Sequence, residues 1–241
     1  MAKKKVTFAD IAAYTNFSKT TISRYFNNPD SLTLENQEKI AAALEELGYQ
    51  ENKLAKVLAN GKSEFVGIII PNLYLHYYSE ILNQLLSSYS KFGYKFLVFV
   101  SNDGREREQQ YINELLAYKI EGLIILSHTF SSAELAKCNI PIVAIEREAK
   151  HICSVDTDNY MGGLQATSLL IRNHCDILIH VNVPVPENVP AHNRITAFED
   201  TCQKYHVPYE LMLGDLGSTY ETTFDRIKET FETIEEKYPD R

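Results

Sequence analysis

Cysteine is scarce in this chain of 241 residues, which has four. No two of them show the C-x-x-C spacing of a zinc or redox site, and their density is far below that of a disulfide framework. We therefore expect ordinary free thiols in a reducing cytosol, at Cys138, Cys153, Cys175 and Cys202.

Long apolar runs are also missing. Met1–Lys5 is charged, but no apolar segment follows it as in an export signal. No run is long enough to span a membrane. The sequence thus predicts a cytoplasmic protein with no membrane partner, and it disfavours an exported binding protein.

Motifs of enzyme chemistry are absent as well. The sequence has no G-x-G-x-x-G after an expected strand, no P-loop, no H-E-x-x-H and no G-x-S-x-G. His174 and His180 flank one apolar run, and we interpret them as structural residues rather than metal ligands. Gly162 and Gly163 lie early in a helix-forming stretch, which favours close packing over a phosphate loop. We predict no catalytic residue, no metal and no cofactor.

Charge is divided unevenly along the chain. Residues 1–62 carry nine basic and seven acidic residues, whereas residues 63–241 carry 15 basic and 25 acidic ones. A basic head on an acidic body is typical of a protein that directs only its head at a polyanion. The length suits one small and one medium domain.

In the N-terminal segment, capping residues and apolar residues recur at the spacing of short helices. Thr7, with an Asp three residues later as in a capping box, should start a first helix that runs to about Tyr14. Asn16 tolerates the left-handed conformation that a tight turn needs. Ser18 is a good N-cap for a second helix, Lys19–Phe26.

The buried and exposed faces of these helices differ in polarity, which suggests a function. Ile22 and Phe26 should face inward, and a third helix should run from about Thr33 to Gly48. The outward residues of the second helix are polar or basic: Lys19, Thr20, Ser23 and Arg24. This pattern predicts a helix-turn-helix that reads the major groove. The alternative is a generic three-helix bundle whose charged face is merely solvated.

Two ungapped stretches carry a more specific pattern. The chain reads Val6-Thr7-x-x-Asp10-Ile11-Ala12, and then Phe17-Ser18-x-x-Thr21-Ile22-Ser23-Arg24-x-x-Asn27. They resemble the head of the lac-repressor (LacI–GalR) family of bacterial transcription regulators, with Thr15-Asn16 in place of the usual Ala-Gly turn.

The resemblance implies two kinds of contact with double-stranded operator DNA. Lys19 and Thr20 occupy the recognition-helix positions that vary within the family and set base choice, and Arg24 occupies that of a guanine-reading arginine. Five further residues match family positions that hold DNA phosphates: Thr7, Ser18, Thr21, Ser23 and Asn27. Such contacts fix the register of the protein on the DNA without reading its sequence.

Within the hinge segment 51–62, residues Asn52–Ala59 resemble the family's hinge helix. In the family two hinges pair in the minor groove, where a leucine from each wedges into a central base step. Leu58 occupies that position, Ala55 allows the partner helix to approach, and Asn52 belongs to the same motif. Glu51 replaces the usual proline. A plain helical linker is the alternative.

From residue 63 apolar runs alternate with amphipathic stretches. Expected strands are Phe65–Ile70, Lys95–Val100, Leu123–Leu126, Ile142–Ile145, Ile177–Val181 and Leu211–Leu213. Expected helices cover about Tyr78–Phe92, Arg105–Lys119, Ser131–Cys138, Asn159–Asn173, Arg194–His206 and Tyr220–Tyr238. The alternation predicts an α/β body with parallel sheets and right-handed crossovers, so that the whole chain is α plus α/β.

Several stretches of the body resemble the family's effector-sensing core, a two-lobed α/β fold similar to periplasmic sugar-binding proteins. They include Val66–Asn72, Gly122–Ile125, Ile140–Val143, Val155–Gly162 and Arg194–Phe198. The resemblance implies a small effector, a sugar or sugar phosphate, between the lobes. Its candidate binding residues are Tyr77, Ser127, Arg147, Asp158 and Arg194. Alternatively, Tyr77 only packs the lobes together and Arg194 only forms a surface salt bridge.

The body also departs from the family pattern. Pro184 and Pro186 stand in the cleft loop where the family has Gly-Gly, which leaves the effector class open. Family members are longer, so we expect this chain to be a fragment or a naturally shortened product with an incomplete second lobe. Missing strands would expose edges and apolar surface, which predicts poor solubility or weak effector binding.

Together these features predict a homodimeric transcription regulator, a repressor of a carbohydrate-use operon controlled by a small sugar-like effector. Its parts would be a head (1–50), a hinge (51–62) and a truncated sensing core (63–241). One alternative is a global regulator of the same fold that answers to a phosphocarrier protein. A sugar-binding or sugar-modifying protein is disfavoured, because neither an export signal nor a catalytic constellation is found.

Overall fold

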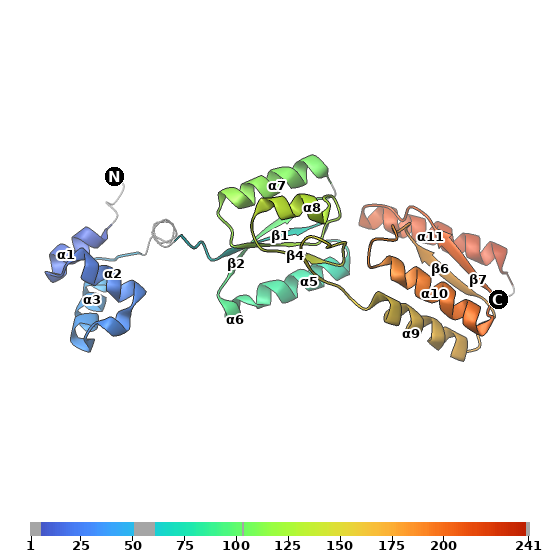
Figure 1. Cartoon of the computed structure of the whole chain (residues 1–241), viewed down its shortest axis with the longest axis horizontal. Helices are drawn as coiled ribbons and strands as arrows, with labels where there is room; N and C mark the ends of the chain where they lie inside the picture. The colour runs from blue at the N-terminus through green and yellow to red at the C-terminus, as the bar shows by residue number, and fades with distance from the viewer. Residues whose placement is uncertain (1–5, 51–60, 103, 240–241) are drawn as a thin grey trace. The chain divides into compact units, whose positions relative to one another are not determined.

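The computed structural model describes residues 6–50, 61–102 and 104–239 (Figure 1). The chain divides into two compact units, Met1–Gly61 and Lys62–Arg241. We call the described part of the first unit the head and the second unit the core.

The head contains the three predicted helices, α1 (Phe8–Thr15), α2 (Lys19–Asn27) and α3 (Leu34–Glu46), with a short 3-10 turn η1 (Pro29–Ser31) before α3. The backbone N–H of Thr7 donates to the Asp10 carboxylate at 2.8 Å, as predicted for the start of α1. Asn16 ends that helix in the left-handed conformation, at φ 58°. The turn between α1 and α2 therefore forms without the family's usual glycine, because asparagine tolerates this conformation.

Apolar side chains from all three helices form the centre of the head. Ile11, Ile22, Ile40 and Ala43 are buried in one cluster. Gly48 then takes a left-handed conformation at φ 61°. The N–H groups of Gly48 and Tyr49 donate to the carbonyls of Glu45 and Leu44, a Schellman arrangement that ends α3.

The core begins with lobe one, residues 63–155. Its parallel sheet has the order β2-β1-β3-β4-β5. The strands are β1 (Phe65–Ile70), β2 (Lys95–Val100), β3 (Gly122–Ile125), β4 (Ile142–Ile145) and β5 (Cys153–Val155). The helices are α5 (His76–Ser87), α6 (Tyr89–Phe92), α7 (Arg105–Ala117) and α8 (Ser132–Leu135), followed by the 3-10 turn η2 (Ala136–Cys138).

Both faces of this sheet are covered (Figure 1). Ile69 packs with α7 and α8 on one face, whereas Ile68 and Ile70 pack against α5 on the other. This explains why β1 reads as a continuous apolar run rather than an alternating one.

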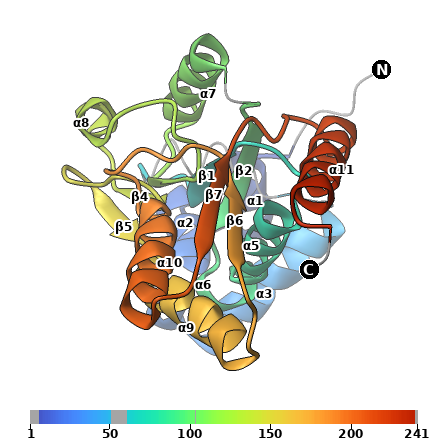
Figure 2. The same cartoon turned by 90° about the vertical axis from the view of Figure 1, so that its right-hand side faces the viewer.

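Lobe two, residues 159–237, contains α9 (Asn159–Arg172), β6 (Leu178–Asn182), α10 (His192–Tyr205), β7 (Tyr209–Leu213) and α11 (Tyr220–Lys237). Its described strands, β6 and β7, pair in parallel. Helices α9 and α10 lie on one side of them and α11 on the other (Figures 1 and 2). Leu178, Phe198 and Cys202 form the buried cluster of this lobe.

The prediction of an α plus α/β chain with parallel sheets is confirmed, and most element bounds agree within two residues. Strand β5 was missed. All three of its residues are exposed and it pairs only along β4, so no apolar pattern marks it. Helix α10 begins at His192, two residues before the expected start.

The glycine pair in α9 offers a matched test of helix packing. A Cβ on Gly163 would lie 2.9 Å from the Arg194 carbonyl oxygen and 3.0 Å from the Ala197 Cβ, whereas a Cβ on Gly162 would meet nothing within 4 Å. Gly163→Ala should destabilise the core by about 1–3 kcal/mol, because α10 has to move away. Gly162→Ala should stabilise it by about 0.5–1 kcal/mol through helix propensity. Denaturant unfolding of the two variants checks this, and equal effects would contradict the close approach.

Candidate DNA-reading helix and effector cleft

Helix α2 presents one side of the head to solvent. The Ser18 hydroxyl accepts from the Thr21 N–H at 3.1 Å and so caps the helix, while Ile22 is fully buried against α1 and α3. Lys19 and Thr20 are exposed in the first turn of α2. A rigid helix with its buried side anchored in this way can present its first turn to a groove.

Arg24 lies one turn further along the same helix, and its side chain is exposed. Across the described ranges, neither Arg24 nor Lys19 takes part in an ion pair. A guanidinium of this kind can bind a guanine edge through two hydrogen bonds.

Four of the predicted phosphate-holding residues cap α2 or lie on it, the fifth, Thr7, caps α1, and their polar groups are pre-arranged by local bonds. The Thr7 hydroxyl donates to Asp10 at 2.6 Å, the Ser18 and Thr21 hydroxyls lie 2.9 Å apart, and Asn27 Nδ2 donates to the Ser23 hydroxyl at 3.2 Å. Their roles toward phosphate stay predictions. The predicted hinge contacts Asn52, Ala55 and Leu58 lie outside the described residues.

The core contains a cleft of about 730 Å³ that is lined by both lobes. Its walls come from the start of α5, the loop after β3, the loop after β4, the loop after β6 and the first turn of α10. Three of these loops follow the carboxyl ends of parallel strands, which is where α/β sheets place their ligand sites.

Three polar side chains form a connected chain at this cleft. Arg194 Nε donates to Asn159 Oδ1 at 2.6 Å, and Asn159 Nδ2 donates to Glu146 Oε2 at 2.9 Å. Arg194 also lies 4.0 Å from Glu146 in an ion pair. Burial alone would raise the pKa of Glu146, but hydrogen bonds from Asn159 and Thr157 outweigh it and hold that pKa below its ordinary value. The carboxylate therefore stays charged.

Tyr77, Arg147 and Arg194, three of the five predicted effector residues, line this cleft. The Tyr77 ring is 44% exposed and meets the Tyr78 ring edge-on, with 5.2 Å between centroids. Burial and the Glu146 charge raise the pKa of its phenol. The Arg147 guanidinium is buried and donates to the backbone carbonyls of Ser127 and Phe130.

The other two predicted effector residues lie elsewhere. Ser127 is fully buried and its hydroxyl donates to Glu108 at 2.6 Å, so it is not among the residues that line the cleft. Asp158 accepts from the Met161 N–H at 2.9 Å as the N-cap of α9. Asp158 lines a smaller pocket of about 280 Å³.

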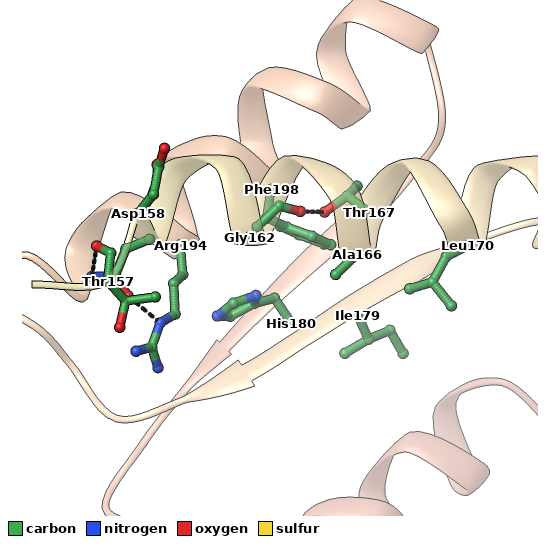
Figure 3. Close-up of a pocket in the computed structure, with 12 residues that line it drawn as sticks. Thr157, Asp158, Gly162, Ala166, Thr167, Leu170, Ile179, His180, Arg194 and Phe198 are labelled. Atoms are coloured by element: carbon green, nitrogen blue, oxygen red, sulfur yellow. Dashed lines mark hydrogen bonds between the residues drawn. The ribbon is translucent and has the colours of Figure 1, made fainter. Parts of the chain in front are cut away.

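Figure 3 shows the smaller pocket between α9 and β6, with Thr157 and Arg194 at one end and Leu170 and Ile179 at the other. His180 lies between them, and its ring packs against Phe198 with 5.1 Å between centroids. Burial and the nearby Arg194 charge lower the pKa of His180.

Glu146 and Asn159 were missed by the sequence reasoning, although signals for both were present. Glu146 directly follows β4, next to the predicted Arg147, and Asn159 directly follows the predicted Asp158. Among the residues described, no group of three or more His, Cys, Asp or Glu side chains is arranged to hold a metal ion. None of the described helices is long and apolar enough to cross a membrane.

Comparison with known families decides the affiliation of the chain. Residues 7–52 match the family of bacterial regulatory proteins called the lacI family. Residues 63–230 match the periplasmic binding proteins and sugar-binding domain of the LacI family. The chain belongs to the LacI family. The predictions of family and fold are thereby confirmed.

Similar LacI-family proteins include operon repressors. The chain is 31% identical over 208 residues to the sucrose operon repressor of Streptococcus mutans, covering 85% of this chain and 65% of that protein. It is 31% identical over 181 residues to the transcriptional regulator GntR of Escherichia coli, covering 72% of this chain and 54% of that protein. The chain thus spans between half and two thirds of the length of these relatives.

Solved structures of LacI-family proteins share the fold. A crystal structure of the lac repressor dimer, bound to operator and the anti-inducer ONPF, has a TM-score of 0.75 and 24% identity, and the match covers 94% of this chain and 71% of that one. A cellobiose complex of the regulator CelR has a TM-score of 0.57 and 20% identity, covering 98% of this chain and 72% of that one. At these sequence identities the structural match shows a shared fold and nothing more.

Proposed function

We propose that this LacI-family chain is a sequence-specific DNA-binding regulator that represses a carbohydrate-use operon in response to a small sugar-like effector. The observation that carries the proposal is helix α2, whose exposed Lys19, Thr20 and Arg24 stand on a helix anchored by the buried Ile22. It works in the bacterial cytoplasm, where the operator DNA lies.

On DNA, α2 enters the major groove and Arg24 reads a guanine, while the surrounding hydroxyl and amide groups hold phosphates. The protein acts as a homodimer, so that two heads read the half-sites of a pseudo-palindrome. Asn52, Ala55 and Leu58 contribute the minor-groove contacts between the half-sites.

In the core, the effector is a sugar or sugar phosphate held in the cleft. The half-exposed Tyr77 side chain offers an apolar face to a sugar ring, and Arg194 and Glu146 offer donors and acceptors to hydroxyl groups, with the buried Asn159 holding both in place. Effector binding changes DNA affinity because the effector stabilises one arrangement of the core over another. Arg147 shapes this site through the backbone carbonyls that it binds, and we assign no effector contact to Ser127 or Asp158.

A binding-site selection on random DNA with the full chain tests the DNA-reading part. We expect enrichment of a pseudo-palindrome, and salt-dependent binding without enrichment would overturn the proposal. Sucrose, ribose, cellobiose and their phosphates are then added to the complex with the selected DNA, because relatives or neighbours are named for these three sugars. We expect one of these compounds to change the affinity for that DNA. If none of them does, the effector is not one of these sugars or their phosphates, and that part of the proposal is contradicted.

A further inference from the structure

We propose that the first turn of α7 holds the cleft loop, residues 127–131, in place, with Glu108 and Arg105 as positioning residues. The loop supplies His128, Phe130 and Ser131 to the cleft wall. The inference rests on the proposed function only where it concerns effector binding in the cleft. The positioning of the loop by α7 is inferred from contacts and burial alone.

Glu108 is the buried part of this hold. Its carboxylate is fully buried on α7 and accepts from the Ser127 hydroxyl at 2.6 Å, which is a charge-assisted hydrogen bond. Ser127 is equally buried. A carboxylate is costly to keep away from water unless it forms such bonds, so its place here indicates a specific task.

Arg105 holds the same loop from the exposed end of the turn. Its Nη1 donates to the Thr129 carbonyl at 2.9 Å, and its guanidinium lies 4.3 Å from the centroid of the Phe130 ring. Its Nη2 forms an ion pair with Glu134 of α8 at 2.5 Å. Hydrogen bonds from Ser131, reinforced by Arg105, hold the pKa of Glu134 at about 2, so this anchor is charged at neutral pH.

Arg147 holds the loop from the side of β4 by donating to the carbonyls of Ser127 and Phe130. Three of the loop's carbonyl groups are thus bound by guanidinium groups. Burial lowers the pKa of Arg147, and the charges of Glu108 and Glu148 act against this. Glu108 Oε2 and Arg147 Nε are buried without a hydrogen bond in the described structure, so each side chain is bound to the loop through its other polar atoms.

A tryptophan reporter tests the hold, because the chain has no tryptophan of its own. In the full chain carrying Phe130→Trp, addition of Glu108→Gln should shift the emission to longer wavelength as the ring gains contact with water. Glu106 lies on the same turn of α7 and is exposed, so Glu106→Gln is the matched control and should leave the emission unchanged. Equal emission from both variants would overturn the proposal.

Hydrogen exchange checks the same point without the reporter. The Glu134 and Leu135 amides bond to the Ser131 carbonyl at the end of the loop, and the Leu126 amide bonds to Ile69 in the sheet. Glu108→Gln and Ser127→Ala should each speed exchange at the first two amides about tenfold, with little effect at Leu126. The double variant should add little to either one, because both remove the same bond. Equal acceleration at all three amides would mean general destabilisation and would overturn a positioning role.

Sucrose and the other sugars are tested in parallel for their effect on the melting temperature. If the melting temperature of the wild-type chain responds to none of them, the proposed effector is contradicted. The hydrogen-exchange data still test whether α7 positions the loop. If one sugar binds, Glu108→Gln should weaken it about tenfold and leave binding of the selected DNA unchanged. One contrary outcome is a variant that shows faster amide exchange in the loop and yet binds the sugar with unchanged affinity. That result would show that the position of the loop does not matter for sugar binding, and it would overturn the positioning role of Glu108 in the cleft.

Discussion

Replacing Arg24 with alanine is expected to lower affinity for the selected operator by about 1–3 kcal/mol per half-site, or roughly 5- to 150-fold. The reason is that α2 presents this guanidinium to solvent without an ion pair in the described residues, so two of its N–H donors are available to a base edge. Binding to random DNA should fall far less, because it depends mainly on total positive charge. Titrations of both DNAs at several salt concentrations give the measurement.

Arg24→Lys is the informative companion variant. Lysine keeps the charge but cannot form the paired, planar contact, so specificity at one base position should relax while the salt dependence stays nearly the same. An equal loss by Arg24→Ala on operator and random DNA would instead assign Arg24 to phosphate contact.

Replacing Arg194 with alanine is expected to weaken the sugar response at least about tenfold while leaving operator affinity unchanged. Arg194 organises Asn159 and Glu146 through the 2.6 Å bond and the 4.0 Å ion pair, so the variant loses a donor and leaves the Glu146 carboxylate without its counter-charge. Effector titration of the complex with the selected DNA measures the response. Arg226→Ala is the matched control, because that arginine pairs on the exposed surface with Glu229.

The same variant has a readout that needs no effector. Burial and the Arg194 charge together lower the pKa of His180. Arg194→Ala removes the second cause, so the His180 ring should titrate at higher pH than in the wild type, and in Arg226→Ala it should not move. NMR titration of the ring protons gives both values. An unchanged His180 pKa would show that Arg194 does not act on this pocket.

Much of the fold could be predicted because local rules decide it. Strands β1, β2 and β4 have the bounds that the apolar runs indicate. Asn16 ends α1 because asparagine tolerates the left-handed conformation, and Ser18 starts α2 because its hydroxyl caps the helix. Strand β5 could not be predicted, since an exposed three-residue edge strand depends on its neighbour rather than on its own pattern.

The effector site was only partly predictable, for a related reason. Ser127 follows a strand as a ligand-binding serine would, yet its hydroxyl is taken by Glu108 from a helix 19 residues earlier in the chain. Glu146 became recognisable only when Asn159 and Arg194 were seen to reach it from lobe two. Which polar group is bound internally and which faces a cleft depends on contacts between distant segments, and no single stretch of sequence encodes them.

Helix α11 has a consequence for the behaviour of the protein in concentrated solution. Its apolar side chains recur at helical spacing along one face and stay open to water, with Tyr220 65%, Phe224 61%, Ile227 37% and Phe231 58% exposed. Such a stripe makes molecules attract one another at short range. The osmotic second virial coefficient should therefore be negative, and Phe224→Lys combined with Phe231→Glu should move it toward positive values at unchanged net charge. Light scattering over a concentration series would reveal this, and an unchanged coefficient in the double variant would place the attraction elsewhere on the surface.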